Sequence, residues 1–358
     1  MYSCMIPLYK PYMPKVLPEI ERILYSGALA YGKWGHQFEK RLSSFIGVEN
    51  LLSTNSYASA IQVALTALDL QYGDEVITSP MSCLASNMPL LTFGLKVVWA
   101  DVDPNTGTLL PESVKEKITP KTRLIFHNHY CGYIGYVDEI NTIGKEYSIP
   151  VIDDCVEAFG SKYKGSYAGN LGTDISIFSF QTVRLPNTVD GGAIVFKDKR
   201  LYEKALLMRD FGIRRNIFRD SNGEIAAGCD IYMKGYGATM SEINSYIGCC
   251  VMDDINDLLA RQKQNAGNWK KELVGVKTLE RDEIEPNFWI FGVLSKDKIG
   301  DILSFREKGF YASGVHLPNS FYSVFGETPK MNGVTAFYDR FVALPCGWWF
   351  IHDINREG

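Results

Sequence analysis

Short apolar runs alternate with helical patterns through the first two thirds of the chain, and this alternation limits the fold more than any other feature. The runs are apolar on both faces and rich in β-branched residues, as in buried strands. They lie at residues 75–78, 96–100, 123–126, 149–152, 175–180 and 192–196. Apolar residues at helical spacing separate them, for example across 61–68, 137–147 and 202–209. The alternation predicts an α/β fold with a mostly parallel sheet flanked by helices.

The pattern changes after about residue 240. Residues 240–264 have a long helical pattern with no strand before it, and an apolar run at 288–294 and a helical pattern at 299–308 follow. The chain then becomes rich in aromatic residues, ending in a run that includes Trp348 and Trp349. We therefore predict a large α/β domain with an N-terminal segment over residues 1–244, and a smaller C-terminal α+β domain over 245–358.

Composition excludes several classes of function. Lys and Arg number 37 and Asp and Glu number 41, so the formal net charge is −4, which argues against a nucleic-acid binder. The start lacks a signal-peptide pattern, and no apolar stretch has the length of a membrane span. The eight cysteines and five histidines show neither disulfide nor zinc spacing. The sequence predicts a reduced, cytoplasmic protein without a metal.

Polar residues that follow predicted strands are the first candidates for a site, because ligands of parallel sheets bind at the carboxyl ends of strands. Ser56 and Ser59 lie at a helix start, where backbone N–H groups attract anions, although on spacing alone an ordinary helix cap is the more common explanation. Asp154 follows an apolar run and can pair with a cationic ring nitrogen or serve as a turn residue. Ser179 can donate to a phosphate or bond to the backbone.

Several segments in this order resemble the DegT family of nucleotide-sugar aminotransferases. Gly73-Asp74-Glu75-Val76-Ile77 and Asp153-Asp154-Cys155-Val156-Glu157-Ala158 match two of its motifs, and Phe178-Ser179-Phe180 and Asp190-Gly191-Gly192 bracket the position of its Schiff-base lysine. Near the C-terminus, Val315-His316-Leu317-Pro318-Asn319 and Gly347-Trp348-Trp349 resemble a subgroup's signature. Each match alone is weak, but together they cover nearly the whole chain in the same order.

The resemblance implies an aspartate-aminotransferase-like fold, which is fold type I of the pyridoxal phosphate (PLP) enzymes. It also implies a homodimer with the active site at the subunit interface, and we expect residues 214–237 to take part in that interface. In the family a lysine carries PLP and moves the proton, the amino donor is usually glutamate, and the acceptor is a nucleotide-linked keto sugar made for surface polysaccharide. By position, Asp154, Ser179, Ser56, Ala58, Ser59 and Cys83 would surround the cofactor, and His316 and Asn319 would face the substrate.

The sequence departs from the family at the lysine itself, where it has Arg184. A guanidinium stays protonated, so it cannot form the Schiff base and is a poor proton carrier. Neither Lys164 nor Lys234 has the register to replace it. Tyr57-Ala58 stands where the family has a pair ending in threonine, Cys83 replaces the stacking aromatic, Glu157 replaces Gln or His, and Gly237 replaces a partner-subunit Asn. We expect PLP or its amine form (PMP) to bind non-covalently if at all.

Three functions stay open at this stage. The chain could be an enzyme that uses non-covalent PLP or PMP, a PLP-free enzyme on the same nucleotide sugar, or a non-catalytic partner subunit of a true aminotransferase. Arg184, Glu157 and His129 are the catalytic candidates, although a structural hydrogen bond suits His129 better. Arg184 itself has two interpretations: binding a carboxylate or phosphate, or neutralising Asp154.

Overall fold

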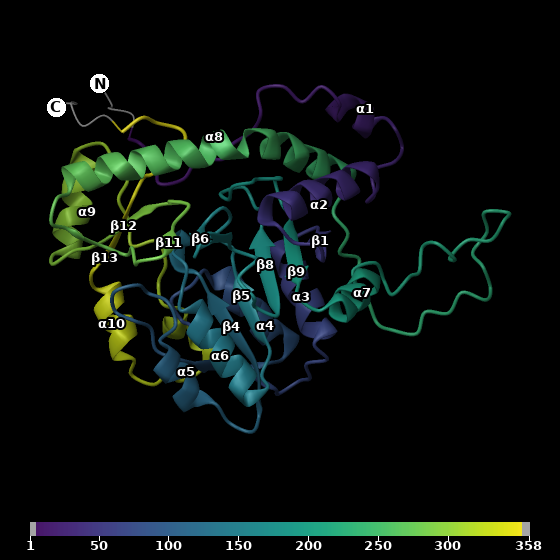
Figure 1. Ribbon diagram of the computed structural model, residues 1–358, viewed down its shortest axis with the longest axis horizontal. Helices are drawn as coiled ribbons and strands as arrows, with labels where there is room; N and C mark the ends of the chain where they lie inside the picture. The colour runs from purple at the N-terminus through teal and green to yellow at the C-terminus, as the bar shows by residue number, and fades with distance from the viewer. Residues whose placement is uncertain (1–4, 353–358) are drawn as a thin grey trace.

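The chain folds around a central seven-stranded sheet with strand order β1-β9-β8-β5-β4-β2-β3. The computed structural model describes residues 5–352 (Figure 1). The strands are β1 (Leu51–Thr54), β2 (Glu75–Thr78), β3 (Lys96–Trp99), β4 (Thr122–Asn128), β5 (Val151–Asp154), β8 (Ile175–Ser179) and β9 (Gly192–Phe196). The neighbours β3-β2-β4-β5-β8 pair in parallel, and β9 is antiparallel to both β8 and β1. The predicted mostly parallel α/β sheet is therefore confirmed.

Helices cover both faces of this sheet because successive strand residues point to opposite sides. Ile152 packs in a cluster with α3 (Tyr57–Ala67), α4 (Leu84–Phe93) and α7 (Lys199–Met208). Val151 points the other way, into a cluster with α5 (Pro111–Lys117) and α6 (Val137–Tyr147). The remaining part of that second face packs against α2 (Lys33–Ile46) and α8 (Glu242–Glu272).

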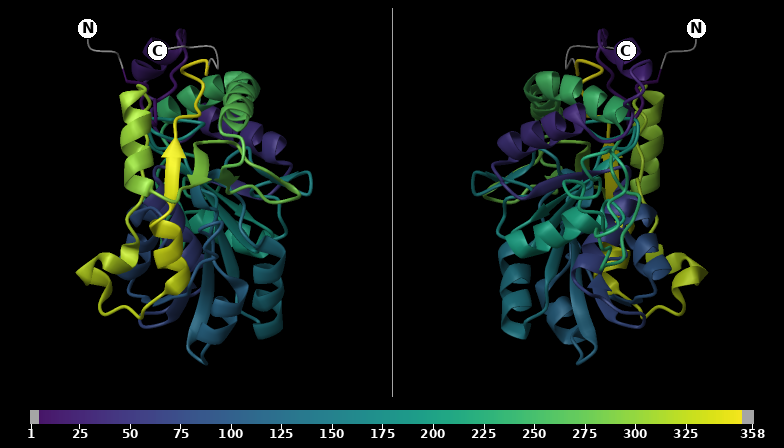
Figure 2. Two further views of the ribbon diagram at one scale, coloured as in Figure 1. Left: turned by 90° about the vertical axis from the view of Figure 1, so that its left-hand side faces the viewer. Right: turned by 90° about the vertical axis from the view of Figure 1, so that its right-hand side faces the viewer.

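The C-terminal part builds a second, smaller unit beside the first. Helix α8 runs along one side of the whole molecule and leads into an antiparallel sheet of β10 (Lys277–Thr278), β12 (Phe291–Leu294) and β13 (Phe341–Leu344) (Figure 1). Helices α9 (Lys298–Glu307) and α10 (Asn332–Tyr338) complete it, and Figure 2 shows α9 beside β13. The remaining helices are short: α1 (Ile20–Leu24), η1 (Tyr130–Gly132), η2 (Asn319–Phe321) and η3 (Ser323–Phe325).

Several contacts cross the boundary predicted at residue 245, and two of them are β-pairings. A small sheet joins β6 (Lys162–Tyr163) and β7 (Ser166–Tyr167) to β11 (Ile284–Glu285). Ile6, near the N-terminus, forms a β-bridge with Phe310 in the small unit. The division at 245 stays a prediction, and the N-terminal segment contacts the small unit as well as the large one.

Within residues 5–352, none of the helices combines the length and the apolar character that a membrane span needs. The seven cysteines in this range are free thiols.

Candidate active site

Strand β5 ends in two aspartates that point to opposite faces of the sheet. Asp154 is fully buried on the side of α3 and α4, where its Oδ1 accepts hydrogen bonds from the Tyr57 hydroxyl at 2.7 Å and the Val156 N–H at 3.1 Å. Its Oδ2 has no partner among the described residues. Burial raises the pKa of Asp154. The sheet therefore presents one buried, unpaired carboxylate oxygen at the candidate site.

A cavity of about 550 Å³ lies beside this carboxylate at the start of α3. Ser56 caps the helix, because its hydroxyl accepts the Ser59 N–H at 3.1 Å and donates to the Ser59 hydroxyl at 2.9 Å. The cavity lining includes Ser56, Ala58, Cys83, Val156, Ser179 and Arg184. The structure thus brings together four of the residues predicted to surround the cofactor position, Ser56, Ala58, Cys83 and Ser179, with the catalytic candidate Arg184. Ser59, predicted with them, lies behind Ser56 as its hydrogen-bond partner.

A larger cavity of about 890 Å³ lies at the opposite edge of the sheet, near Pro150 and Asp174, which precede β5 and β8. Ligands of parallel sheets bind at the carboxyl ends of the strands. The smaller cavity, which holds the predicted residues, is therefore the better candidate for the active site.

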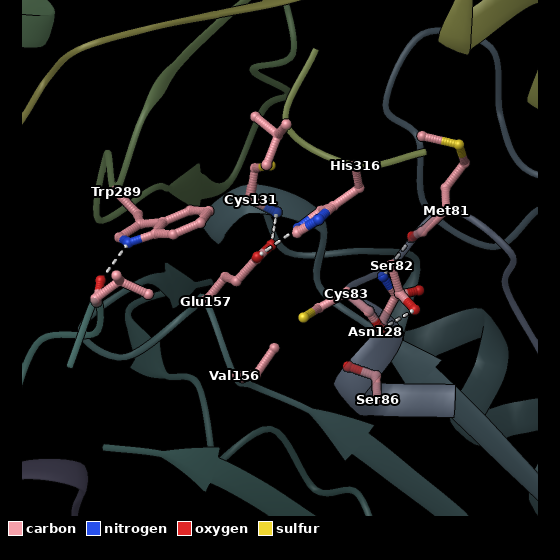
Figure 3. A network of polar contacts seen from close by, with 12 residues as sticks. Met81, Ser82, Cys83, Ser86, Asn128, Cys131, Val156, Glu157, Trp289 and His316 are labelled. Atoms are coloured by element: carbon pink, nitrogen blue, oxygen red, sulfur yellow. Dashed lines mark hydrogen bonds and ion pairs between the residues drawn. The ribbon is translucent and has the colours of Figure 1, made fainter. Parts of the chain in front are cut away.

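Glu157 is the centre of a buried charged cluster that connects the two parts of the molecule. Its Oε2 accepts the Cys131 N–H at 2.6 Å, and its Oε1 receives His316 Nε2 at 2.9 Å and Arg184 Nη1 at 3.3 Å. Figure 3 shows the first two of these contacts, with His316 reaching Glu157 from the small unit. Both carboxylate oxygens are therefore occupied.

The cluster keeps Glu157 ionised. Burial alone would raise the pKa of Glu157, but the charges and hydrogen bonds of His316 and Arg184 outweigh it and lower the pKa to about 2. A carboxylate with so low a pKa and no free oxygen is a poor general base. The structure therefore favours a positioning role for Glu157 over the predicted catalytic one.

Arg184 is buried and held on several sides. Its guanidinium carbon lies 4.5 Å from the centre of the Trp289 ring, which in turn stacks on Tyr9 at 4.6 Å. The indole N–H of Trp289 donates to the Val183 carbonyl at 3.1 Å (Figure 3). Burial acts to lower the pKa of Arg184, but the facing Glu157 raises it overall.

The interpretation in which Arg184 neutralises Asp154 is wrong, because the guanidinium pairs with Glu157 instead. Asp154 is held by an uncharged partner, the Tyr57 hydroxyl, whose oxygen also lies 3.2 Å from Ser86 Oγ. Tyr57 was missed as a site residue because an aromatic at the first helical position is usually read as core. Its place directly after Ser56 is the one sequence signal that could have revealed it.

His129 lies on the other face of the sheet and does not reach this cavity. Its Nδ1 accepts the Gly135 N–H at 3.1 Å, and its Nε2 lies 3.6 Å from Asp153 Oδ2. Asp153 also receives His127 Nδ1 at 3.0 Å and the Thr173 hydroxyl at 2.6 Å. The histidines hold the pKa of Asp153 well below its ordinary value against the effect of burial. The structure does not bring His129 to the cavity, and it shows the structural hydrogen bond that the sequence favoured for this residue.

The three groups His127, His129 and Asp153 are fully buried and lie close enough for one metal ion. Their contacts with one another and with Thr173 already explain them as a hydrogen-bonded support for β4 and β5. The prediction of a protein without a metal stays a prediction.

The two residues predicted to face a substrate differ in their surroundings. Asn319 is 1% exposed, donates to the Ser82 carbonyl at 3.0 Å and accepts from Asn87 Nδ2 at 3.0 Å. This arrangement braces the small unit against α4 and leaves no free surface for a substrate. His316 keeps partial exposure but is bonded to Glu157.

The described residues that line the cavity include no lysine. Lys164 is half exposed on the surface, where it pairs with Asp138 at 2.9 Å, and Lys234 is also exposed. Gly237 forms a bridge with Asp210, and a Cβ atom there would meet the Phe211 ring at 2.5 Å. The described lining of the cavity therefore includes a guanidinium and no primary amine.

Comparison with known proteins identifies the family. The model of the DegT/DnrJ/EryC1/StrS aminotransferase family matches residues 14–347. The chain belongs to this family. It is 28% identical over 297 residues to GDP-perosamine synthase of Escherichia coli O157:H7, covering 81% of this chain and 78% of that protein.

Two crystal structures show the same fold over nearly the full length. One is the sugar aminotransferase CalS13 from Micromonospora echinospora, with a TM-score of 0.90 and 30% identity. The other is AtS13 from Actinomadura melliaura, with a TM-score of 0.91 and 30% identity. Each comparison covers 98% of this chain and 96% of the other chain. The predicted family and the fold of type I PLP enzymes are confirmed.

Proposed function

We propose that this protein is an atypical DegT-type sugar aminotransferase homologue that binds a nucleotide-linked keto sugar and cannot hold PLP through a lysine. The observation that supports this is Arg184, buried in the cavity, paired with Glu157 and unable to form a Schiff base. The relative named GDP-perosamine synthase supports a nucleotide sugar as the ligand class. From the family resemblance we propose a role in the biosynthesis of a surface polysaccharide or a deoxyamino sugar. We also propose a cytoplasmic location, as predicted from the sequence.

The cavity has groups that suit non-covalent PLP or PMP, which would supply an electron-accepting ring. The unpaired Oδ2 of Asp154 suits a protonated ring nitrogen, because a buried carboxylate oxygen without a hydrogen-bond partner is stabilised by a cationic donor. The start of α3 and the Ser56 and Ser179 hydroxyls suit a phosphate. Ala58 offers no hydroxyl there, and Cys83 offers no aromatic face, so we expect weak binding.

The PLP-free alternative has its own support in the charged cluster. Arg184 and Glu157 neutralise each other in the space beside the cavity, so this space is stable without a cofactor. The non-catalytic partner subunit remains the third possibility. Activity measured alone and after mixing with a lysine-bearing homologue separates these two, because only a partner subunit needs the mixture.

We further propose a homodimer that uses the segment between α7 and α8. This segment projects from the body of the molecule (Figure 1) and exposes Phe211, Ile225 and Tyr232 by 56%, 62% and 58%. A second copy of the chain would cover these apolar side chains. Light scattering should give twice the chain mass for the wild type and a lower mass for Ile225→Asp, and a monomeric wild type at micromolar concentration would contradict the proposal.

The function is tested by titrating the purified protein with nucleotide-linked 4-keto sugars in a calorimeter and by recording its absorbance with added PLP. We expect saturable binding of at least one nucleotide sugar. With added PLP, we expect no absorbance band of a Schiff base between PLP and a lysine. An absence of binding for GDP-, UDP- and dTDP-linked sugars would contradict the proposed ligand class.

A further inference from the structure

We propose that Arg184 forms an oxyanion subsite in this cavity, which takes a carboxylate or phosphoryl group where the family has its lysine. The inference concerns the same cavity as the proposed function and rests on it, and it adds the charge of the group bound at this position.

The Arg184 guanidinium is held in place by its neighbours, but only some of its N–H groups have hydrogen-bond partners. Its Nη1 donates to Glu157, one face stacks against Trp289, and its backbone N–H is tied to the Gln181 carbonyl at 2.8 Å. The side chain is more than nine-tenths buried and yet lines the cavity. Its Nε and Nη2 groups donate to no protein acceptor within residues 5–352. Because Arg184 lines the cavity, these N–H groups can meet an acceptor that enters it.

The charges around Arg184 leave it free to attract an anion. Glu157 divides its single negative charge between Arg184 and His316. Asp154 does not line the cavity itself; its Oδ1 is bonded to two residues that do, Tyr57 and Val156. Asp190 lines the cavity too, but it is exposed and its Oδ1 accepts the Gly191 N–H at 2.8 Å.

The shape of the donor group defines the ligand chemistry. Two neighbouring N–H groups of a guanidinium form a planar fork that matches the two oxygens of a carboxylate or phosphate. A cationic group, such as the ammonium of an aminated ligand, would meet a like charge at the same place. The subsite therefore selects an anionic group and disfavours an amine.

The experiment titrates the full-length protein separately with succinate, inorganic phosphate and GDP, following binding by calorimetry and by the tryptophan fluorescence of the wild type. Because Arg184 stacks on Trp289, an oxyanion at Arg184 should change the fluorescence, and the change should disappear in Trp289→Phe. Binding should weaken about 10- to 100-fold in Arg184→Gln, which follows from the loss of a charge-assisted hydrogen bond. It should weaken less in Arg184→Lys, and it should stay unchanged in Arg200→Gln, a matched control on the surface.

Succinate binding that depends on Arg184 identifies a carboxylate source, and binding of phosphate or GDP alone identifies a phosphoryl source. Equal affinity of Arg184→Gln and wild type for every probe, or no binding of any probe to the wild type, would overturn the inference. If the wild type binds none of the three probes but still binds a nucleotide sugar, the inference about Arg184 fails while the proposed function stands. The failure of the inference is therefore distinguishable from the failure of the proposed function.

Discussion

Replacing Glu157 with Gln removes the one negative charge that faces both Arg184 and His316. The magnitude follows from the ionisation of Glu157, because its pKa falls from 4.5 to about 2 in the folded protein. A shift of this size corresponds to about 3 kcal/mol of folding free energy. Breaking a buried ion pair from one side costs about 3–5 kcal/mol, so both routes give a similar loss for Glu157→Gln at pH 7.

The effect of Glu157→Gln on the free energy of unfolding should depend on pH. The folded state lowers the pKa of Glu157, so the carboxylate contributes its full stability above the unfolded pKa and loses it as the pH falls from about 4.5 towards about 2. Urea unfolding of wild type and Glu157→Gln at pH 7 and pH 3 measures this. We expect a difference of about 3 kcal/mol at pH 7, most of which is lost by pH 3.

The matched control is Glu146→Gln, whose carboxylate is half exposed and pairs with Lys115 on the surface. It should change the free energy of unfolding by less than about 0.5 kcal/mol. If Glu157→Gln lowers the free energy of unfolding no more than Glu146→Gln does, Glu157 does not stabilise the fold through this cluster. A loss that is as large at pH 3 as at pH 7 would also contradict the ionised state of Glu157.

Three further predictions concern the residues around Glu157 and the opposite face of the sheet. Arg184→Lys should become yellow with added PLP and gain one pyridoxyl group on borohydride reduction, whereas a colourless variant would show that the remaining cavity no longer accepts the cofactor. Tyr57→Phe should lower the free energy of unfolding by about 1 kcal/mol or more, because Asp154 loses a buried hydrogen bond; an unchanged urea midpoint would argue against that contact. His129→Gln should destabilise the protein by about 1–3 kcal/mol through Asp153 and Gly135 while leaving nucleotide-sugar affinity within about twofold, and a large loss of affinity in calorimetry would return His129 to the site.

The sequence predicts the elements that apolar periodicity controls. The run at 149–152 and the following aspartates correspond to β5, and the helical pattern from 240 corresponds to α8, which continues to Glu272. The two-residue strands β6, β7, β10 and β11 leave no periodic signal, because two residues are too few to show an alternation. The run at 288–294 begins its strand only at Phe291, since Phe288 adopts a φ of 53°.

For the candidate site, the sequence predicts which residues lie at the cavity but not which residues pair with them. Alignment with family motifs places Asp154, Ser56, Cys83 and Arg184 around one cavity. In the structure Ser56, Cys83 and Arg184 line it, and Asp154 lies behind the lining residues Tyr57 and Val156. The partner of Arg184 depends on which side chain faces it after folding, and neither spacing nor motif carries that information. His316 reaches Glu157 across 159 residues of chain. Sequence reasoning therefore found the residues of the cavity more reliably than their ionic partners.

Borohydride reduction shows whether this protein can attach PLP through a lysine. The wild-type protein is incubated with PLP, reduced, unfolded and measured by intact mass, followed by peptide mapping. The account predicts no stoichiometric pyridoxyl addition and no modified lysine in a cavity-lining peptide. A single lysine fully converted to its pyridoxyl form would contradict it, because Arg184 would then not occupy the position of the attaching amine.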